Sequence, residues 1–342
     1  MKAIVFRQHG GPDVLEYTDV PDPLLESGRI LVRVNACAIN HLDLWIRQGI
    51  PAYRIGLPHI SAADVAGVIE RIVDGVTGVR VGDRVVLSPG LNCRRCQWCL
   101  AGSDSLCASY GIRGAATDGG YAELISADAA DALPIPPTLS FEHAAAFPLV
   151  FLTAWHMLVT RARLKAGDTV LVQAAGSGVG HAAILIAKHL NATIYATVGS
   201  DAKVPKAKAL GPAEVVNYQR EDVEARIRVL TDGRGVDVVV EHIGPHTWSS
   251  SLKVLAKGGR LVTCGATTGP TASLDLRYVF SRQLSILGST MGTRAELDEV
   301  TRLIAAGLLR PVIDTIVPLR EARHAQERML QRDVFGKLIL VP

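Results

Sequence analysis

The feature that most constrains the fold is a regular alternation of strand and helix patterns in the second half of the chain. Runs rich in Val, Ile and Leu recur at 169-TVLVQAA, 193-TIYATV, 214-EVVNY, 236-VDVVVEHI, 260-RLVTCGA and 284-LSILGS. Helical patterns lie between them, such as 180-GHAAILIAKHLN and 201-DAKVPKAKALG. Continuous apolar strands separated by helices are typical of a parallel sheet covered on both faces. We therefore expect an α/β domain with a doubly wound parallel sheet over residues 151–290.

A glycine-rich loop joins the first of these strands to the next helix. In 174-AAGSGVGHAAILIAKHL the turn falls at Gly176, Ser177, Gly178, Val179 and Gly180. Glycines permit a tight turn there and let the backbone approach a pyrophosphate, which the helix N-terminus also attracts. A structural turn is the simpler interpretation of such a loop taken alone. Within at least five alternating strand–helix units, it predicts a dinucleotide-binding loop.

The end of the second strand bears on which cofactor binds. An NAD site usually places a carboxylate there, about 20 residues past the loop, against the ribose 2′-hydroxyl. Val198 occupies that position, and Ser200 and Lys203 follow it, offering a hydroxyl and a cation that suit a 2′-phosphate. Asp201 argues for NAD, although it falls at the start of the next helix, where it could equally serve as a cap. We predict NADP(H), with NAD as the alternative.

The first 150 residues have a different pattern. Short β-like runs separated by turn residues lie at 2-KAIVF, 30-ILVRVNACAI, 65-VAGVIERIV, 84-RVVLS and 121-YAELISA, which indicates a mainly β domain of barrel-like type. A chain of 342 residues also exceeds one ordinary core. The tail from residue 291 has two amphipathic helical segments and a final strand, 337-KLILVP, and we expect it to rejoin this first domain.

Composition and charge limit the partners. The chain carries 36 basic and 33 acidic residues and no run of like charge, so neither nucleic acid nor a membrane surface is expected as a partner. The apolar run in the N-terminal MKAIVFRQHG is too short for a signal peptide or a membrane span. We expect a cytoplasmic protein with reduced thiols that acts on a small-molecule substrate.

Four of the six cysteines lie within 92-NCRRCQWCLAGSDSLC-107. Four thiolates this close in a reducing compartment predict a closed, tetrahedral zinc site. Disulfides and an iron–sulfur cluster are the alternatives, although the bacterial cluster motif ends C-x3-C-P and this one ends C-x7-C-A. The predicted zinc ligands are Cys93, Cys96, Cys99 and Cys107. Cys37 and Cys264 lie in apolar strands, and we expect both to be buried.

Together, the β-rich first domain, the cysteine lobe at about residues 90–110 and the nucleotide domain resemble the medium-chain, zinc-containing alcohol dehydrogenase superfamily. The resemblance covers essentially the whole chain and rests on 65-VAGVIERIVDGVTGVRVGDRVV, 119-GGYAELI, 167-GDTVLVQAAGSGVG and 335-FGKLILV. It implies a GroES-like, mainly β catalytic domain over residues 1–150 and 291–342, and a Rossmann domain over 151–290. The AAGSGVG loop and 198-VGSDAKVPKAKALG are similar to the quinone oxidoreductase branch, which implies NADPH and no catalytic metal.

The comparison with metal-using alcohol dehydrogenases concerns three zinc-ligand positions. Asn40 stands where the resemblance implies a Cys, and Ala63 stands where it implies a His. The third ligand should fall within 146-AFPLVFLTAW, which has neither Cys nor His. Such residues lack the thiolate, imidazole or carboxylate donors that hold Zn²⁺. A site rebuilt from other donors is the alternative, and the candidates for it are Cys37, His41, His59 and Asp64.

The resemblance also implies roles for individual residues. It places Asn40 beside the nicotinamide and Thr153 near the carboxamide, with His41 and Tyr53 as candidate donors to the acceptor oxygen; each of the four has a purely structural alternative. Asp43 is expected to orient its neighbours. The remaining predicted cofactor contacts are Tyr218 and Lys337 toward phosphates, and Ile243, Gly265, Ala266 and Thr267 in loops at the carboxyl edge of the sheet. Residues expected to shape the acceptor pocket, 45-WIRQGIPAYRIG and 110-YGIRGAATDG, are predicted as loops.

Without a Lewis acid, reduction of an electron-poor acceptor is easier than oxidation of an unactivated alcohol. We therefore predict an NADPH-dependent oxidoreductase that transfers hydride to a quinone or an activated alkene or carbonyl, without a catalytic metal and with one structural zinc. The alternatives are an alcohol or aldehyde dehydrogenase with an unconventional metal site, and a non-catalytic NADPH-binding protein with a structural, sensing or nucleic-acid-associated role. The resemblance implies a homodimer, with a homotetramer as the alternative, joined through 260-RLVTCGATTG and 284-LSILGS.

Overall fold

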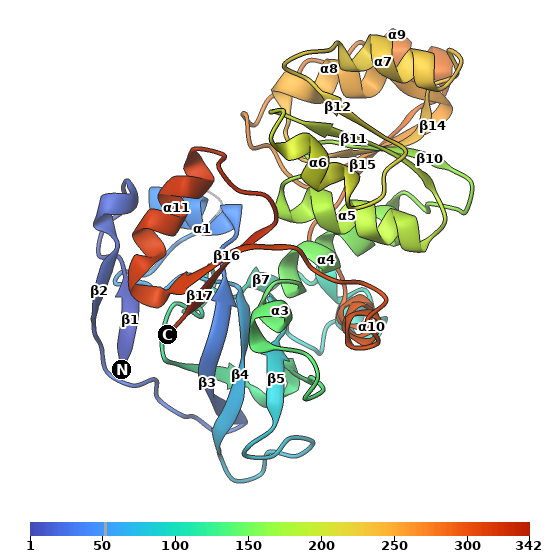
Figure 1. Ribbon diagram of the computed structural model, residues 1–342. Helices are drawn as coiled ribbons and strands as arrows, with labels where there is room; N and C mark the ends of the chain where they lie inside the picture. The colour runs from blue at the N-terminus through green and yellow to red at the C-terminus, as the bar shows by residue number, and fades with distance from the viewer. Residues whose placement is uncertain (51–52) are drawn as a thin grey trace. The chain divides into compact units, whose positions relative to one another are not determined.

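A computed structural model describes residues 1–50 and 53–342 of the chain, which divides into two compact units (Figure 1). Unit 1 comprises Met1–Leu149 together with Thr293–Pro342, and unit 2 comprises Val150–Gly292. The sequence placed these boundaries at 150/151 and 290/291. Tyr53 lies within the described residues, whereas two residues of the predicted loop 45-WIRQGIPAYRIG, 51 and 52, lie outside them.

Unit 2 is built on a six-stranded sheet in the order β12-β11-β10-β13-β14-β15. Every neighbouring pair of strands is parallel. The chain moves outward from β10 to β12, returns to the centre at β13 and then moves outward the other way. This confirms the predicted doubly wound sheet. The strands are β10 (Thr169–Val172), β11 (Thr193–Val198), β12 (Glu214–Asn217), β13 (Val236–Glu241), β14 (Leu255–Thr263) and β15 (Ser285–Gly288).

Helices cover both faces of this sheet. Figure 1 shows α5 (Gly178–His189) and α6 (Lys203–Lys208) on one side, and α7 (Val223–Leu230), α8 (Pro245–Lys253) and α9 (Leu276–Arg282) on the other. The central strands need cover on both faces because consecutive residues, such as Val238, Val239 and Val240, are all fully buried. Such a sheet binds ligands at the carboxyl ends of its strands, at the point where the strand order reverses. Here that point lies between β10 and β13.

Unit 1 is built on a mainly antiparallel sheet in the order β16-β17-β3-β4-β5-β9, with β8 also pairing with β3. The final strand pairs antiparallel with β3, so the C-terminal tail lies in the same sheet as the first domain's strands. Alternate residues such as Val32, Val34 and Val65 point into one buried core. The strands are β3 (Arg29–Ala38), β4 (Asp64–Ile72), β5 (Arg84–Leu87), β8 (Leu124–Asp128), β9 (Ala132–Pro134), β16 (Ile313–Pro318) and β17 (Lys337–Val341).

Shorter elements complete unit 1. Two small antiparallel pairs stand apart from the main sheet: β1 (Lys2–Val5) with β2 (Glu16–Asp19), and β6 (Gly90–Leu91) with β7 (Gly111–Ile112). The helices are α1 (His41–Gln48), α2 (Gln97–Leu100), α3 (Phe141–Ala145), α10 (Arg294–Ala305) and α11 (Ala322–Leu330), and α4 (Pro148–Trp155) runs across the boundary into unit 2. The loop prediction for 45-WIRQ is therefore wrong. These residues form the end of α1, with Leu44 and Ile46 buried, and Gly49 ends the helix.

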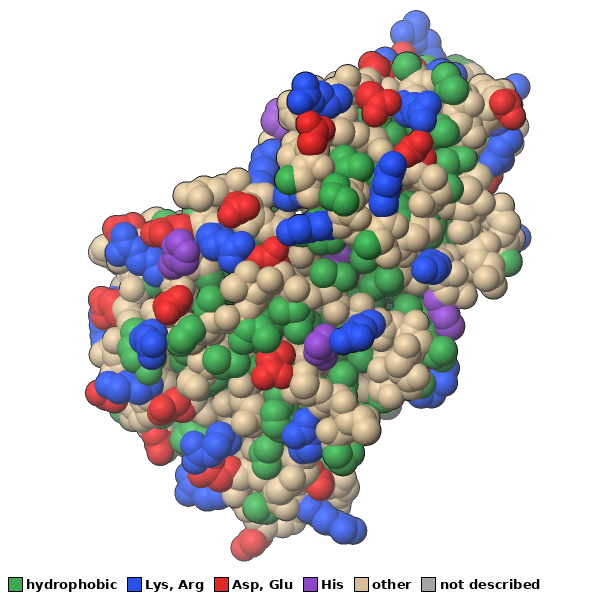
Figure 2. All heavy atoms as spheres, viewed as in Figure 1, with side chains coloured by type: hydrophobic (Ala, Val, Ile, Leu, Met, Phe, Trp, Pro, Cys, Tyr) green, Lys and Arg blue, Asp and Glu red, His purple; other side chains and the backbone are tan. Residues whose placement is uncertain are grey.

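The surface agrees with the balanced composition. On the face shown in Figure 2, Lys and Arg side chains are interspersed with Asp and Glu. Across the described residues, no helix has both the length and the apolar character that crossing a bilayer requires. Cys37 is fully buried, as predicted, whereas Cys264 is only half-buried because it lies just past the end of β14.

Candidate functional site

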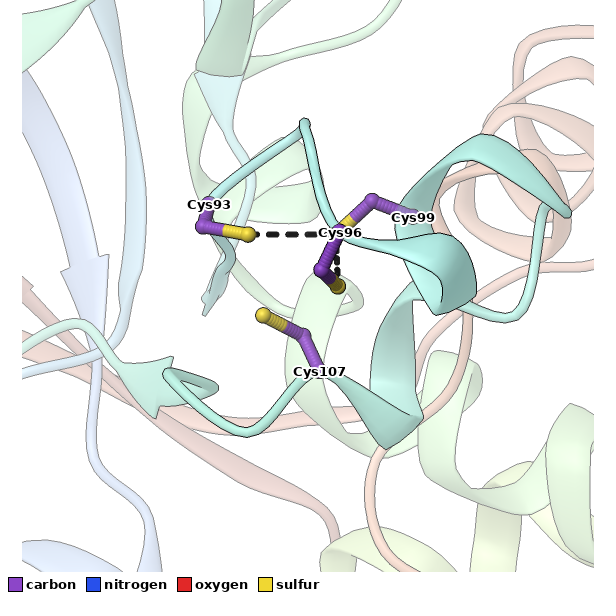
Figure 3. A group of neighbouring side chains, drawn as sticks. All are labelled: Cys93, Cys96, Cys99 and Cys107. Atoms are coloured by element: carbon purple, nitrogen blue, oxygen red, sulfur yellow. Dashed lines mark hydrogen bonds between the residues drawn. The ribbon is translucent and has the colours of Figure 1, made fainter.

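The four clustered cysteines come together at one point of unit 1 (Figure 3). Their sulfur atoms all lie within 4.8 Å of one another, and Sγ of Cys99 is 3.5 Å from Cys96 and 3.9 Å from Cys93. A tetrahedron with zinc–sulfur bonds of about 2.3 Å has sulfurs about 3.8 Å apart. None of the six cysteines is joined in a disulfide. The cluster fits a structural zinc site whose four ligand positions are all filled by protein.

Backbone groups of this lobe favour the thiolate form of Cys93. Arg94 adopts a left-handed conformation (φ 55°), which turns the chain between the first two cysteines. Hydrogen bonds from the backbone N–H groups of Arg95 and Cys96 hold the pKa of the Cys93 thiol below its usual value. Backbone donors that favour the thiolate also favour its coordination to a metal, because the thiolate is the form that binds.

Ion pairs and a helix cap attach the lobe to the rest of unit 1. Arg94 contacts Asp128 and Asp131, each at 2.6 Å, at the end of β8 and in the turn that follows it. Asp104 accepts hydrogen bonds from the backbone N–H of Arg294, the first residue of α10, at 3.1 and 3.2 Å. It also accepts one from Asn92 at 3.0 Å. The cysteine lobe is thus fixed to both the sheet and α10.

A different polar cluster occupies the position where metal-using relatives are expected to hold a catalytic zinc. Asn40 follows β3, Asp64 is the first residue of β4 and Lys337 is the first residue of β17. Because these strands are neighbours, the three side chains meet. Asn40 Nδ2 donates to Asp64 Oδ2 at 2.9 Å, and Lys337 Nζ donates to Asn40 Oδ1 at 2.6 Å and to Asp64 at 3.1 Å. All three are buried, with exposed fractions of 4%, 0% and 2%.

The other two expected zinc-ligand positions also lack a donor side chain. Ala63 is fully buried. Segment 146–155 reaches the network through its backbone, where the Leu149 N–H donates to Asp64 Oδ1 at 2.7 Å. Among residues 1–50 and 53–342, the four cysteines are the one group of three or more His, Cys, Asp or Glu side chains whose ligand atoms converge. Cys37, His41, His59 and Asp64, the donors named for a rebuilt zinc site, do not make up such a group.

Asp43 and Tyr121 extend this network beneath Asn40. Asp43 accepts hydrogen bonds from the Asn40 N–H at 2.8 Å, from the Tyr121 hydroxyl at 3.0 Å and from the Ala62 N–H at 3.3 Å. Burial raises the pKa of Asp43 to about 6 and raises that of Tyr121 well above its usual value. Asp43 thus binds Asn40, Tyr121 and Ala62, and its orienting role in catalysis stays a prediction. Tyr121 was not among the residues predicted for this site, although it lies in the motif 119-GGYAELI.

The other predicted catalytic residues lie in different settings. His41 is the first residue of α1 and stacks edge-on against Trp45, with ring centroids 4.9 Å apart. Burial and the nearby Arg332 lower its pKa, and burial raises the pKa of Tyr53. Thr153 belongs to unit 2, where its hydroxyl lies 3.8 Å from the sulfur of Met291. The roles proposed for these three residues stay predictions.

In unit 2, the glycine-rich loop lies at the carboxyl end of β10, as its position between strand and helix predicts. Ser177 is the N-cap of α5, and its hydroxyl accepts a hydrogen bond from the Gly180 N–H at 2.9 Å and contacts His242 Nε2 at 2.9 Å. A Cβ at Gly180 would lie 2.2 Å from the carbonyl oxygen of Ala174. Only glycine allows this close packing. The twelve-residue α5 therefore begins beside a tight glycine-containing loop, and its N-terminus could hold a pyrophosphate.

The residues predicted for the 2′-position surround the end of β11. The ring of Tyr218 lies over Gly199, because a Cβ at Gly199 would be 2.2 Å from the Tyr218 hydroxyl. Ser200 follows directly, and Lys203 begins α6. The cap suggested for Asp201 is wrong: Ala202 is the N-cap, and the Asp201 carboxylate instead contacts Asn217 and Arg220 at 2.6 and 3.0 Å.

The remaining predicted cofactor residues lie at the ends of β13 and β14. Glu241 is fully buried and accepts hydrogen bonds from the N–H groups of Ile243 and Gly244 at 2.7 and 3.1 Å, which fixes the turn after β13. The Thr267 hydroxyl donates to the His242 carbonyl at 3.0 Å, so the 265–267 loop packs on that turn. Lys337, in contrast, contacts Asn40 and Asp64 in unit 1, and its predicted phosphate contact would compete with these partners.

Comparisons with known proteins agree with this organisation. Residues 26–137 match the model of the alcohol dehydrogenase GroES-like domain, and residues 178–306 match that of zinc-binding dehydrogenases. A quinone oxidoreductase of Rattus norvegicus is 31% identical over 100% of this chain and 98% of its own length. An alcohol dehydrogenase of Geobacillus stearothermophilus is 34% identical over 99% of each chain.

Solved structures of similar proteins belong to the same group of dehydrogenases. A crystal structure described as an NAD-dependent alcohol dehydrogenase is 46% identical, covers 100% of both chains and has a TM-score of 0.96. A cobalt- and zinc-bound alcohol dehydrogenase from Pyrobaculum aerophilum is 33% identical, covers 100% of this chain and 99% of its own, and has a TM-score of 0.91. With both of its domains matched, the chain belongs to the medium-chain zinc-binding dehydrogenase family and is an oxidoreductase.

Proposed function

We propose that this protein is an NADPH-dependent reductase that transfers hydride to a quinone or to an activated alkene or carbonyl, without a catalytic metal and with one structural zinc. The observation that carries the proposal is the buried network of Asn40, Asp64 and Lys337. It fills the place of a catalytic zinc site with an amide, a carboxylate and an ammonium group. An ammonium ion and a divalent cation repel each other, so this donor set does not suit zinc.

The chain's own residues suit an electron-poor acceptor. NADPH, when bound, would supply the hydride. The negative charge then develops on an enolate or hydroquinone oxygen, where neutral hydrogen-bond donors are enough to stabilise it. The lowered pKa of His41 keeps its imidazole neutral at pH values near 7, and the raised pKa of Tyr53 keeps its hydroxyl protonated. Both are therefore donors under the conditions in which the enzyme would work.

The test of the reaction compares two substrate classes under metal control. We expect NADPH oxidation with a simple quinone or a 2-alkenal, no oxidation of simple alcohols, and one zinc per chain by elemental analysis. Activity should survive a mild chelator that does not extract the structural zinc. Two zinc ions per chain, together with activity lost to the chelator, would contradict the proposal.

That contrary result would favour a second candidate, a metal-using alcohol or aldehyde dehydrogenase. The observation that favours it is that two relatives, at 34% and 46% identity, are alcohol dehydrogenases. Both candidates share the nicotinamide cofactor and the structural zinc. They differ in whether a second metal binds and in which direction the reaction runs.

The choice of NADP(H) rests on Ser200, Lys203 and Tyr218 around the end of β11. Asp201 is held by Arg220, which lowers its pKa and partly neutralises the carboxylate that would repel a 2′-phosphate. The relative described as NAD-dependent favours NAD instead.

We expect Lys203→Ala to raise KM for NADPH about tenfold or more and to leave KM for NADH nearly unchanged. Lys206→Ala, a change at an exposed lysine of the same helix, is the matched control.

We further propose a small molecule as the only substrate class and the cytoplasm as the working compartment. Zinc binding by four reduced thiols supports the second point, because an oxidising compartment would favour disulfides. The protein would work as a homodimer, with a homotetramer as the alternative.

A further inference from the structure

We propose that Asp64 and Lys337 are positioning residues that hold the Asn40 carboxamide in a single orientation for catalysis. The inference rests on the proposed function, in which Asn40 lies beside the nicotinamide. It adds the reason why a buried ion pair of unit 1 would matter for hydride transfer. Neither partner needs to touch substrate or cofactor, since each acts through Asn40.

The chemistry of the two partners decides which way the amide points. An ammonium group can only donate, so the atom 2.6 Å from Lys337 Nζ must be the amide oxygen. An ionised carboxylate can only accept, so the atom 2.9 Å from Asp64 Oδ2 must be the amide nitrogen. Turning the amide over would place two donors together and two acceptors together. The orientation is therefore fixed, and one Nδ2 hydrogen remains to donate elsewhere.

The partners are themselves held from separate elements. The second oxygen of Asp64 accepts the Leu149 N–H at 2.7 Å, and Lys337 is in direct contact with Asp64 at 3.1 Å. The Asn40 backbone N–H is bound by Asp43 at 2.8 Å. Main chain and side chain of Asn40 are thus both held by hydrogen bonds. A fully buried ion pair is weak evidence for stability, because desolvation offsets much of its attraction. A positional role accounts for its presence better than a stabilising one.

The test uses two charge-neutral double variants that differ in a single donor. In Asp64→Asn with Lys337→Met, residue 337 can no longer donate to the Asn40 oxygen; in Asp64→Asn with Lys337→Gln, an amide N–H of residue 337 can. We expect kcat for the quinone to fall about 10- to 100-fold in the Met variant and to recover to within about threefold of wild type in the Gln variant. KM for NADPH should stay within about twofold in both, because the cofactor loop belongs to unit 2.

A matched control neutralises a different ion pair of the same unit. Arg328 and Asp314 lie 2.9 Å apart with side-chain exposed fractions of 23% and 10%. Arg328→Met with Asp314→Asn should lower stability while leaving kcat within about threefold of wild type. Equal kcat losses in the Met and Gln variants, or no loss in either, would overturn the positioning role.

A second measurement does not depend on activity. The side-chain amide signals of Asn40 in wild-type protein, assigned by NMR through comparison with Asn40→Asp, should show one hydrogen that exchanges slowly with solvent because Asp64 binds it. Fast exchange of both hydrogens would overturn the inference. If wild-type protein reduces none of the acceptors, the proposed function fails, whereas the amide signals still decide whether Asn40 is held in one orientation.

Discussion

At the scale of single residues, Asp43 shows how burial links the network to pH. Its carboxyl is 1% exposed, and burial raises its pKa from 3.8 to about 6. Because the folded-state pKa exceeds the unfolded one, the folded protein binds the proton more tightly in the interval between them. The free energy of unfolding should therefore fall as pH rises from about 4 to about 6, by up to about 3 kcal/mol, and stay level above it.

Asp43→Asn tests this expectation, because an amide has no proton to lose. The free energy of unfolding of the variant minus that of wild type should increase by about 2–3 kcal/mol between pH 4 and pH 7, measured by urea denaturation. Asp74→Asn, in an exposed turn, serves as the control and should show a constant difference. A constant difference for Asp43→Asn as well would mean that Asp43 titrates as an exposed carboxyl does.

The two clusters of unit 1 also show what a sequence reveals at this scale. The cysteine site could be predicted because its four ligands lie within 15 residues of chain, from 93 to 107, and their spacing is itself the signal. The Asn40 network could not, because Asp64 and Lys337 lie 24 and 297 residues away from Asn40 along the chain. Only the order of β17, β3 and β4 in the sheet brings them together. The only hint in the sequence was Lys337, a charged residue at the start of an otherwise apolar strand, which indicates that its charge is buried.

At the scale of elements, the cysteine lobe caps a helix that follows it by almost 190 residues. Both Asp104 oxygens accept from the first N–H of α10, whose Thr293 N-cap also forms a capping box with Glu296. Asp104→Ala should lower the free energy of unfolding by about 1 kcal/mol and speed amide hydrogen exchange at residues 294–297. Asp298→Ala, which removes an exposed partner of Arg294, should change neither by a comparable amount.

Removing zinc is a second test of the contact between the cysteine lobe and α10. Without a metal, the four thiols no longer hold the lobe, so Asp104 and Arg94 lose their fixed positions. We expect zinc-depleted protein to show faster exchange at residues 294–297 and at 128–131, with the sheet of unit 2 unchanged. Hydrogen exchange read by mass spectrometry would measure this. Uniform exchange across both units would show instead that the zinc supports the whole chain rather than one lobe.

The elements that the sequence missed have identifiable causes. β14 begins at Leu255, five residues before the predicted strand, and its extra part contains 257-KGG, where glycines argue against a strand. The register of β14 against β13 shifts there, so the irregularity is real. Helix α1 was missed because its apolar face covers only two turns before Gly49. The strands of unit 2 were predictable because burial on both faces leaves a continuous apolar run.

At the scale of the whole molecule, the remaining question is how copies associate. β15 is the last strand of the unit 2 sheet, so its outer edge offers unpaired N–H and C=O groups within the described chain. In the preceding helix α9, Leu276 and Phe280 are 68% and 71% exposed. An exposed strand edge together with exposed apolar side chains suits a symmetric homodimer, because the edge of β15 can pair with the same edge of a second copy of the chain.

We therefore predict a dimer whose mass by light scattering is twice the chain mass of 36.5 kDa. Phe280→Asp should shift the population toward monomer by placing a charge in the apolar contact, with the near-ultraviolet spectrum of the folded chain retained. Leu24→Asp, at a side chain that is 83% exposed in unit 1, is the matched control and should leave the dimer intact. A monomeric wild type would refute the prediction, and a tetramer that Phe280→Asp reduces to dimers would place a second interface elsewhere on the chain.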